Sequence, residues 1–194
     1  KALRREEKLY RQYGISQADY EQMLCAQSGV CAICFGGCAP RKYFDVDHRH
    51  DSSESIRGLL CRNCNNAVGL FRDDPSVSAT AILYLRSVPG PSDVHHIPTL
   101  NDPVIGESQS RDLFRRFGLT KSDYLTLWRF QGGVCAICYR KCITRQNLCV
   151  DHSYGGDKRV RGLLCRKCNM GFGKFKDNIH VIARIHSYLL QSKM

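Results

Sequence analysis

The sequence lacks any apolar run near the roughly 18–20 residues that a membrane-spanning helix needs. Its first residues, KALRREEKLY, are too polar for a secretory signal. We therefore expect no membrane partner and a cytoplasmic location. Hydrophobic residues make up 43% of the 194 residues and charged residues 24%, which excludes a wholly disordered or collagen-like chain.

Acidic residues are scarce, with 18 Asp and Glu against 29 Lys and Arg, so the formal net charge is +11. The excess lies in residues 111–194, which carry 17 basic and 5 acidic side chains, whereas residues 1–90 carry 12 and 10. This charge favours a polyanionic partner such as nucleic acid, held most strongly by the C-terminal part. The alternative is that the charge only keeps the chain soluble.

Proline is rare outside one segment, because residues 87–110 hold four of the six prolines and no Lys or Arg. Proline removes a backbone donor and disfavours helix in the residue before it, so we predict an extended linker over 89–110. This prediction places one domain at 1–88 and a second at 111–194.

The two predicted domains are copies of one another. VCAIC at 30–34 recurs at 134–138, and IRGLLCRNCN at 56–65 recurs as VRGLLCRKCN at 160–169, each with an offset of 104. Two copies are too few for a solenoid, in which each repeat is covered by its neighbours. Duplicated compact domains are the better interpretation.

Each copy shows the same order of predicted elements, and the fold class is α+β, mainly helical. A charged helix ends at Gly14 or Gly118, and Ser16 or Thr120 is the N-cap of the next helix. The later elements are short strands in YFDVDH and NLCVDH and in RGLL, helices over 65–71 and 169–175, and a last amphipathic helix after Pro75 or Asp177.

Twelve cysteines are the strongest chemical signal. Each copy has two CxxC pairs separated by 26 residues, a spacing typical of a tetrahedral S₄ site for structural Zn²⁺. The predicted ligands of the two zinc ions are Cys31, Cys34, Cys61 and Cys64, and Cys135, Cys138, Cys165 and Cys168. Disulfides or a redox pair are the alternatives. Four protein ligands leave no open position for water, so a catalytic zinc is not expected.

Four cysteines remain outside these pairs: Cys25, Cys38, Cys142 and Cys149. We interpret them as small buried thiols. Cys38 and Cys142 are in register between the copies, so an alternative role as zinc ligands stays open.

Between its two CxxC pairs each copy carries an Asp-His dipeptide, and an Asn follows the last cysteine. In the first copy these residues are Asp47, His48 and Asn65. Carboxylate and amide oxygens are hard donors that suit Mg²⁺ or Mn²⁺. A neutral imidazole, with a reference pKa of about 6.5, can accept a proton from water. Taken singly, each residue is more often structural; the repeated combination favours a site.

The second copy repeats the set as Asp151, His152 and Asn169. Each copy therefore resembles the recombination endonuclease VII family of HNH (ββα-metal) nucleases. The matching stretches, after CAIC, are VDHRHDSSESIRGLLCRNCNNAVGLFRDD and VDHSYGGDKRVRGLLCRKCNMGFGKFKDN. The resemblance covers most of residues 10–86 and 114–190.

The resemblance implies two tandem zinc-clipped ββα-metal domains with flanking helices, in a prokaryotic or phage-type protein that hydrolyses DNA phosphodiesters. It implies that Asp47 and Asn65, or Asp151 and Asn169, bind one divalent Mg²⁺ or Mn²⁺ per site. His48 and His152 then resemble the general bases. Family members often carry a second histidine two places after the base, present here as His50 but replaced by Tyr154 in the second copy.

Arg57 and Arg161, in the RGLL strands, are candidates to clamp a phosphate by bidentate hydrogen bonds, with a solvent-facing arginine as the alternative. The leading functional hypothesis is a metal-dependent endonuclease on duplex or branched DNA, acting in restriction, nicking or recombination. We expect it to act as an internal pseudo-dimer, which would allow a monomeric chain to present two sites. The alternatives are a non-catalytic zinc-stabilised DNA-binding protein and a zinc module that binds proteins.

Overall fold

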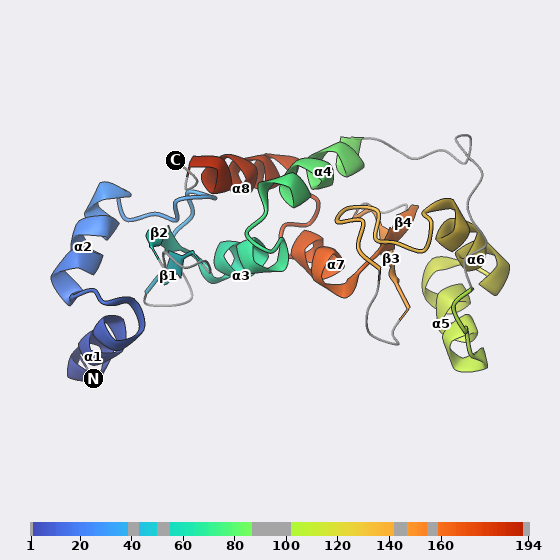
Figure 1. Cartoon of the computed structure of the whole chain (residues 1–194), viewed down its shortest axis with the longest axis horizontal. Helices are drawn as coiled ribbons and strands as arrows, with labels where there is room; N and C mark the ends of the chain where they lie inside the picture. The colour runs from blue at the N-terminus through green and yellow to red at the C-terminus, as the bar shows by residue number, and fades with distance from the viewer. Residues whose placement is uncertain are drawn as a thin grey trace. The chain divides into compact units, whose positions relative to one another are not determined.

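The computed structural model describes residues 2–38, 43–49, 55–86, 102–141, 147–154 and 159–191. Within these ranges it contains eight helices and four short strands (Figure 1). The predicted fold class, α+β and mainly helical, is confirmed. No described helix is long and apolar enough to cross a membrane.

The elements follow the same order in both halves of the sequence. The first half holds α1 (Ala2–Tyr13), α2 (Gln17–Ala26), β1 (Asp45–His48), β2 (Ile56–Leu60), α3 (Arg62–Leu70) and α4 (Pro75–Arg86). The second half holds α5 (Glu107–Phe117), α6 (Lys121–Phe130), β3 (Cys149–His152), β4 (Val160–Leu164), α7 (Arg166–Gly173) and α8 (Ile179–Gln191).

The predicted helix boundaries have clear local causes. Ser16 and Thr120 are the N-caps of α2 and α6, and each forms a capping box with an aspartate three residues later. The hydrogen bonds from Thr120 hold the pKa of Asp123 below its usual value. Gly118 ends α5 in the left-handed region, with a φ of 67° that glycine adopts without strain.

Each half builds an antiparallel two-stranded hairpin followed by a helix, β1-β2-α3 or β3-β4-α7. Asp47 pairs with Gly58, and the register shifts between Asp47 and His48, so a bulge separates the two residues. The second hairpin repeats the register and the bulge, with Asp151 opposite Gly162. In each pair the aspartate is buried and the histidine is half-buried.

A glutamine side chain hydrogen-bonds to the backbone at the edge of each hairpin. The side-chain Nε2 of Gln27 donates to the carbonyl of Leu59 at 2.9 Å, and its Oε1 accepts from the Leu59 amide at 2.8 Å. Gln131 binds Leu163 in the same way. These bonds satisfy the backbone groups on the open edge of β2 and β4 and tie α2 and α6 to the hairpins.

The chain folds into two compact units that cut across the sequence repeats. The first unit is residues 1–75 with 180–194, and the second is residues 76–179. Nearly all of α4 therefore belongs to the unit built by the second repeat, and nearly all of α8 to the unit built by the first. The two repeats have exchanged their last helices.

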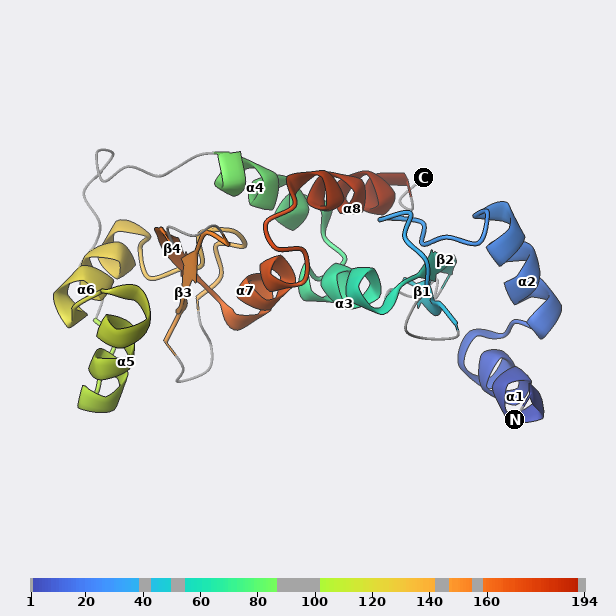
Figure 2. The same cartoon turned by 180° about the vertical axis from the view of Figure 1, so that it is seen from behind.

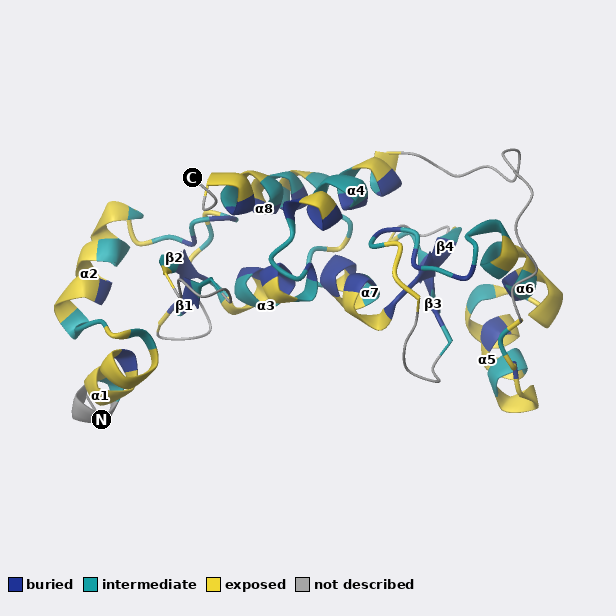
Figure 3. Cartoon of the chain, viewed as in Figure 1, coloured by how far each residue is buried: buried dark blue, intermediate teal, exposed yellow. Residues whose placement is uncertain are grey.

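Each unit has its own apolar core around its hairpin, whereas α1 and α2 are largely exposed (Figure 3). The core of the first unit includes Leu59, Leu60 and Phe71, together with the exchanged residues Ile182 and Ile185, all at or near zero exposure. In the second unit, α5 and α6 lie on one side of the β3–β4 hairpin and α7 on the other (Figures 1 and 2). The exchanged helices thus form part of each core.

Candidate active site and cysteine clusters

The predicted zinc ligands converge into two clusters. The sulfur atoms of Cys31, Cys34, Cys61 and Cys64 all lie within 4.8 Å of one another, and those of Cys135, Cys138, Cys165 and Cys168 do the same. In each cluster the first CxxC lies in the turn before the hairpin, and the second CxxC opens α3 or α7. Each cluster can therefore fix the start of a helix to the hairpin.

The ionisation of these thiols shows why a cation suits the clusters. Hydrogen bonds to Cys31 and then Cys61 raise the pKa of Cys64, whereas the hydrogen bond from Cys61 lowers the pKa of Cys31. One thiolate therefore suppresses ionisation of its neighbours. A divalent ion offsets this repulsion, and four sulfur donors at tetrahedral spacing are the set that structural zinc prefers.

Among the described residues, the other cysteines are not members of the two clusters. Cys25 is exposed, so the prediction of a buried thiol is wrong there, and Cys38 and Cys149 are only half-buried. Cys142 lies outside the described residues. The described cysteines carry free thiols, so they form no disulfides with one another.

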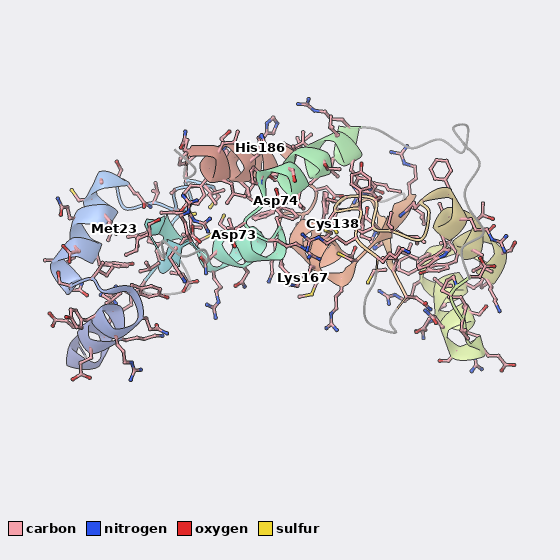
Figure 4. The ribbon with its side chains drawn as sticks, viewed as in Figure 1. Met23, Asp73, Asp74, Cys138, Lys167 and His186 are labelled. Atoms are coloured by element: carbon pink, nitrogen blue, oxygen red, sulfur yellow. The ribbon has the colours of Figure 1, made fainter. Side chains whose placement is uncertain are left out.

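Asp47 lies in β1 as a buried carboxylate and is held by a neighbouring arginine. Arg57 Nε donates to Asp47 Oδ2 at 2.7 Å, and Arg57 Nη2 donates to Oδ1 at 2.9 Å. The same guanidinium donates to Asp73 Oδ1. Asp73 lies in the turn after α3 (Figure 4) in the left-handed region, with a φ of 55°.

The second repeat builds the same network. Arg161 Nε donates to Asp151 Oδ2 at 2.7 Å and its Nη2 to Asp151 Oδ1 at 3.1 Å. Its Nη1 and Nη2 donate to Asp177 at 2.8 and 2.9 Å, and Nη2 also reaches the carbonyl of His152 at 3.0 Å. The pairing is therefore a property of the repeated sequence.

Arg57 and Arg161 are not placed at an open surface. Their side chains are only 5% and 9% exposed, and each guanidinium faces two carboxylates. Burial alone would lower the pKa of Arg57, but its hydrogen bonds to Asp47 and Asp73 raise that pKa overall. These surroundings make each arginine a support for its aspartate and leave it little access to a phosphate.

A tyrosine completes each carboxylate network. Tyr188 of α8 donates its hydroxyl to Asp47 Oδ2 at 2.8 Å, and Tyr84 of α4 donates to Asp151 Oδ2 at 2.9 Å. Burial, followed by the charge of the neighbouring aspartate, raises the pKa of both tyrosines. Both phenols therefore stay protonated and act as donors.

The predicted bases lie at the ends of β1 and β3 and are half-buried. His152 Nδ1 is 2.9 Å from the carbonyl oxygen of Ser153. Because a carbonyl oxygen can only accept, Nδ1 carries the proton and Nε2 of the neutral ring is the free acceptor. The ring of His48 packs edge-on against Tyr13, with centroids 5.4 Å apart, and His152 packs on Phe117 at 5.6 Å.

The predicted amide ligands follow the last cysteine of each cluster. Asn65 and Asn169 are half-buried in the first turns of α3 and α7, and neither side chain hydrogen-bonds to a described residue. Asn169 lines a hollow of about 280 Å³ together with Phe117 and Val150. Asp151 is not among the described residues that line this hollow.

The hydrogen bonds described for the two aspartates do not use every acceptor position of their carboxylates. A carboxylate offers about four acceptor positions. Among the described residues, Asp47 Oδ2 accepts two hydrogen bonds and Oδ1 accepts one, so one acceptor position on Oδ1 has no described donor, and Asp151 repeats this arrangement. The predicted ligands, a carboxylate and an amide oxygen, are hard donors whose chemistry suits Mg²⁺ or Mn²⁺ better than zinc.

The second histidine of the first copy, His50, lies outside the described residues. Its counterpart Tyr154 is exposed, and its backbone amide donates to Asp177 Oδ2 at 2.9 Å. The Tyr154 ring lies 6.4 Å from that of His152. This tyrosine therefore links the end of the hairpin to the aspartate that also holds Arg161.

Sequence reasoning missed Tyr84, Tyr188, Asp73 and Asp177 as members of the site. A signal was present, because Tyr84 and Tyr188 share the offset of 104 and the aspartates lie in FRDD and FKDN at that offset. The equal spacing marks these residues as repeated, but it does not tell which hairpin each tyrosine reaches.

Comparison with known proteins agrees with this architecture. A family model described as recombination endonuclease VII matches residues 6–87 and again residues 110–191. Gene 59 protein of Mycobacterium phage D29 is 34% identical over 102 residues, which cover 52% of this chain and 61% of that protein. Gene 59 protein of Mycobacterium phage L5 is 34% identical over 103 residues, which cover 53% and 62%.

The chain thus spans about three-fifths of the length of these relatives. No solved structure matches it. Because the family model covers most of the chain in two successive regions, the protein belongs to the recombination endonuclease VII family and carries two tandem copies of its domain.

Proposed function

We propose that this protein is an HNH-type endonuclease that hydrolyses phosphodiester bonds of DNA at two sites. The observation that carries the proposal is the imidazole of His152, whose Nδ1 proton is fixed on the Ser153 carbonyl beside a buried aspartate. That arrangement leaves Nε2 as a base of the right type, and the sequence repeats the Asp-His pair as Asp47 and His48. Family membership agrees with such a role.

Asp47 and Asn65 would hold a divalent Mg²⁺ or Mn²⁺ at one site, and Asp151 and Asn169 at the other. Such an ion, when bound, offsets negative charge that develops on the phosphate oxygens. Arg57 and Arg161 fix the rotamers of the two aspartates through paired hydrogen bonds. The cysteine clusters would carry structural zinc and keep the hairpin and helix of each site together.

The histidines would do the proton chemistry. His48 or His152 accepts a proton from water at Nε2, and the water oxygen attacks the phosphorus in line with the leaving 3′ oxygen. The new P–O bond forms as the bond to the 3′ oxygen breaks, and that oxygen takes up a proton from solvent. The products are a 5′ phosphate and a 3′ hydroxyl.

The charge distribution supports DNA as the substrate. The net charge of +11 matches a polyanion, and phosphate contacts should make binding weaken steeply with added salt. Two sites in one chain suit the two strands of a duplex or branched junction. We propose that the chain acts as an internal pseudo-dimer.

A non-catalytic zinc-stabilised DNA-binding protein is the second candidate. The observation in its favour is that each buried aspartate is already neutralised by an arginine, at 2.7 Å in both copies. Such an ion pair can be purely structural. The two candidates differ in one result, because a binding protein retards DNA in a gel but never cuts it.

The test is cleavage of a supercoiled plasmid and of a four-way junction in Mg²⁺ or Mn²⁺. Loss of a general base typically costs about 10²–10⁴-fold in rate. The variant with both His48→Ala and His152→Ala should lose cleavage by at least about 100-fold and still bind DNA. Each single variant should retain one active site.

The matched control is His180→Ala, which removes an exposed histidine of α8 outside both sites. This control should cleave like the parent chain. Cleavage unchanged in the double variant would refute the assigned bases. DNA binding without cleavage by the parent chain in either metal would favour the second candidate.

A further inference from the structure

The exchanged helices bring a hydroxyl from each repeat to the carboxylate of the other. Tyr188, from the second repeat, donates to Asp47 of the first at 2.8 Å. Tyr84, from the first repeat, donates to Asp151 of the second at 2.9 Å. Each pair lies within one compact unit. Neither repeat therefore contains all the groups that touch its own aspartate.

The packing around each tyrosine is specific. A β-carbon added to Gly58, which pairs with Asp47, would lie 3.2 Å from Tyr188 Oη. One added to Gly162 would lie 3.1 Å from Tyr84 Oη. The glycine of each RGLL strand thus makes room for the tyrosine hydroxyl over the hairpin. The same close approach in two copies indicates a built contact rather than a chance one.

The hydroxyl determines which carboxylate oxygen stays open. Asp47 Oδ2 accepts from both Arg57 Nε and Tyr188, whereas Arg57 is the only described donor to Oδ1. The tyrosine saturates Oδ2 and leaves the open acceptor position on Oδ1. Without the hydroxyl, both oxygens would have an open position, and the aspartate would no longer present a single one.

We propose that Tyr84 and Tyr188 are positioning residues, each of which orients the metal-binding aspartate of the other repeat, so that the two sites are built in common. This inference rests on the proposed function only for the identity of the aspartates as ligands. Loss of a group that orients a metal ligand typically costs about 10–100-fold in metal affinity or activity.

The test uses full-length chains with one site disabled. In a His152→Ala chain, only the Asp47 site remains, and adding Tyr188→Phe should lower its cleavage rate by about 10–100-fold. In a His48→Ala chain, only the Asp151 site remains, and Tyr84→Phe should have that effect. If each repeat instead built its own site, Tyr84→Phe would slow cleavage at the Asp47 site and Tyr188→Phe would slow cleavage at the Asp151 site.

A second readout needs no cleavage. Mn²⁺ binding, followed by electron paramagnetic resonance without DNA, should show two ions per chain. In an Asp151→Ala chain, Tyr188→Phe should lower the Mn²⁺ affinity of the remaining Asp47 site by about 10–100-fold. In an Asp47→Ala chain, Tyr84→Phe should lower the Mn²⁺ affinity of the remaining Asp151 site by the same factor. A chain that binds Mn²⁺ in this crossed pattern but cuts no DNA would refute the nuclease and leave the exchange standing.

Tyr10→Phe is the matched control, because Tyr10 is 71% exposed on α1 and should change neither readout. If a Tyr→Phe chain fails to fold, Gly58→Ala and Gly162→Ala crowd the same hydroxyls, together with the side-chain oxygens of Gln27 and Gln131, without altering the tyrosines. Effects on the site of the same repeat, equal effects on both sites, no effect on either site, or no Mn²⁺ binding would each overturn the proposal.

Discussion

Replacement of Arg161 by Met is the sharpest test of the carboxylate network. The guanidinium is 9% exposed and hydrogen-bonds to Asp151 and Asp177, whose side chains are 5% and 16% exposed. Met keeps a long unbranched side chain but removes every donor. Two carboxylates then stay in the unit without a counter-charge.

The expected cost is large because the penalty falls on the partners left behind. Breaking a buried ion pair by removing one member typically costs about 3–5 kcal/mol. Arg115→Met, in the same unit, breaks an exposed pair with Asp112, where the two side chains are 76% and 55% exposed. An exposed pair of this kind contributes about 0–1 kcal/mol, so this variant is the control.

The assay is urea unfolding followed by fluorescence. The only tryptophan, Trp128, lies in α6 of the second unit, so its emission reports that unit alone.

A second variant separates electrostatics from packing. Adding Asp177→Asn to Arg161→Met removes one of the two unpaired charges and should restore part of the lost free energy of unfolding. The reasoning is refuted if Arg161→Met costs no more than Arg115→Met, or if the added Asp177→Asn destabilises the unit further.

Three further predictions concern the second unit. Cys168→Ser should lower the zinc content from two ions per chain to one, as measured by atomic emission. A variant that keeps two zinc ions would show that the cluster of Cys168 does not bind zinc. Gly162→Ala places a β-carbon 2.9 Å from Gln131 Oε1 and should cost about 1–3 kcal/mol in urea unfolding, whereas Gly173→Ala, with its nearest atom at 3.5 Å, should cost far less. Thr120→Ala should lower the free energy of unfolding by about 1 kcal/mol, because it removes the N-cap of α6. It should also raise the lowered pKa of Asp123 in an NMR titration, and an unmoved pKa would contradict the capping box. The stability that comes from the lowered pKa is present at neutral pH and is lost as the pH falls through that pKa.

Local features could be predicted because their causes are local. Ser16 and Thr120 cap helices through atoms three residues away, and the CxxC spacing brings two sulfurs together within one turn. Duplication strengthened these predictions, since each pattern occurs twice with the same spacing. The hairpins followed from the DVDH and RGLL stretches.

The exchange of α4 and α8 could not be predicted, because the two repeats have similar cores. The last helix of each copy carries an apolar face that would fit either hairpin, and periodicity reveals the face but not its partner. The environment of Arg57 was inaccessible for a related reason. The sequence shows only an arginine in a strand, which is usually a surface residue. Its two carboxylate partners, Asp47 and Asp73, come close to it only in the folded chain.

The decisive measurement is anomalous scattering from crystals of the full chain soaked in Mn²⁺. The proposal predicts one manganese peak bound by Asp47 and Asn65 and a second bound by Asp151 and Asn169, with both cysteine clusters holding zinc. Aspartates that keep only their arginine and tyrosine partners, with the two asparagines turned away and no manganese between them, would contradict it.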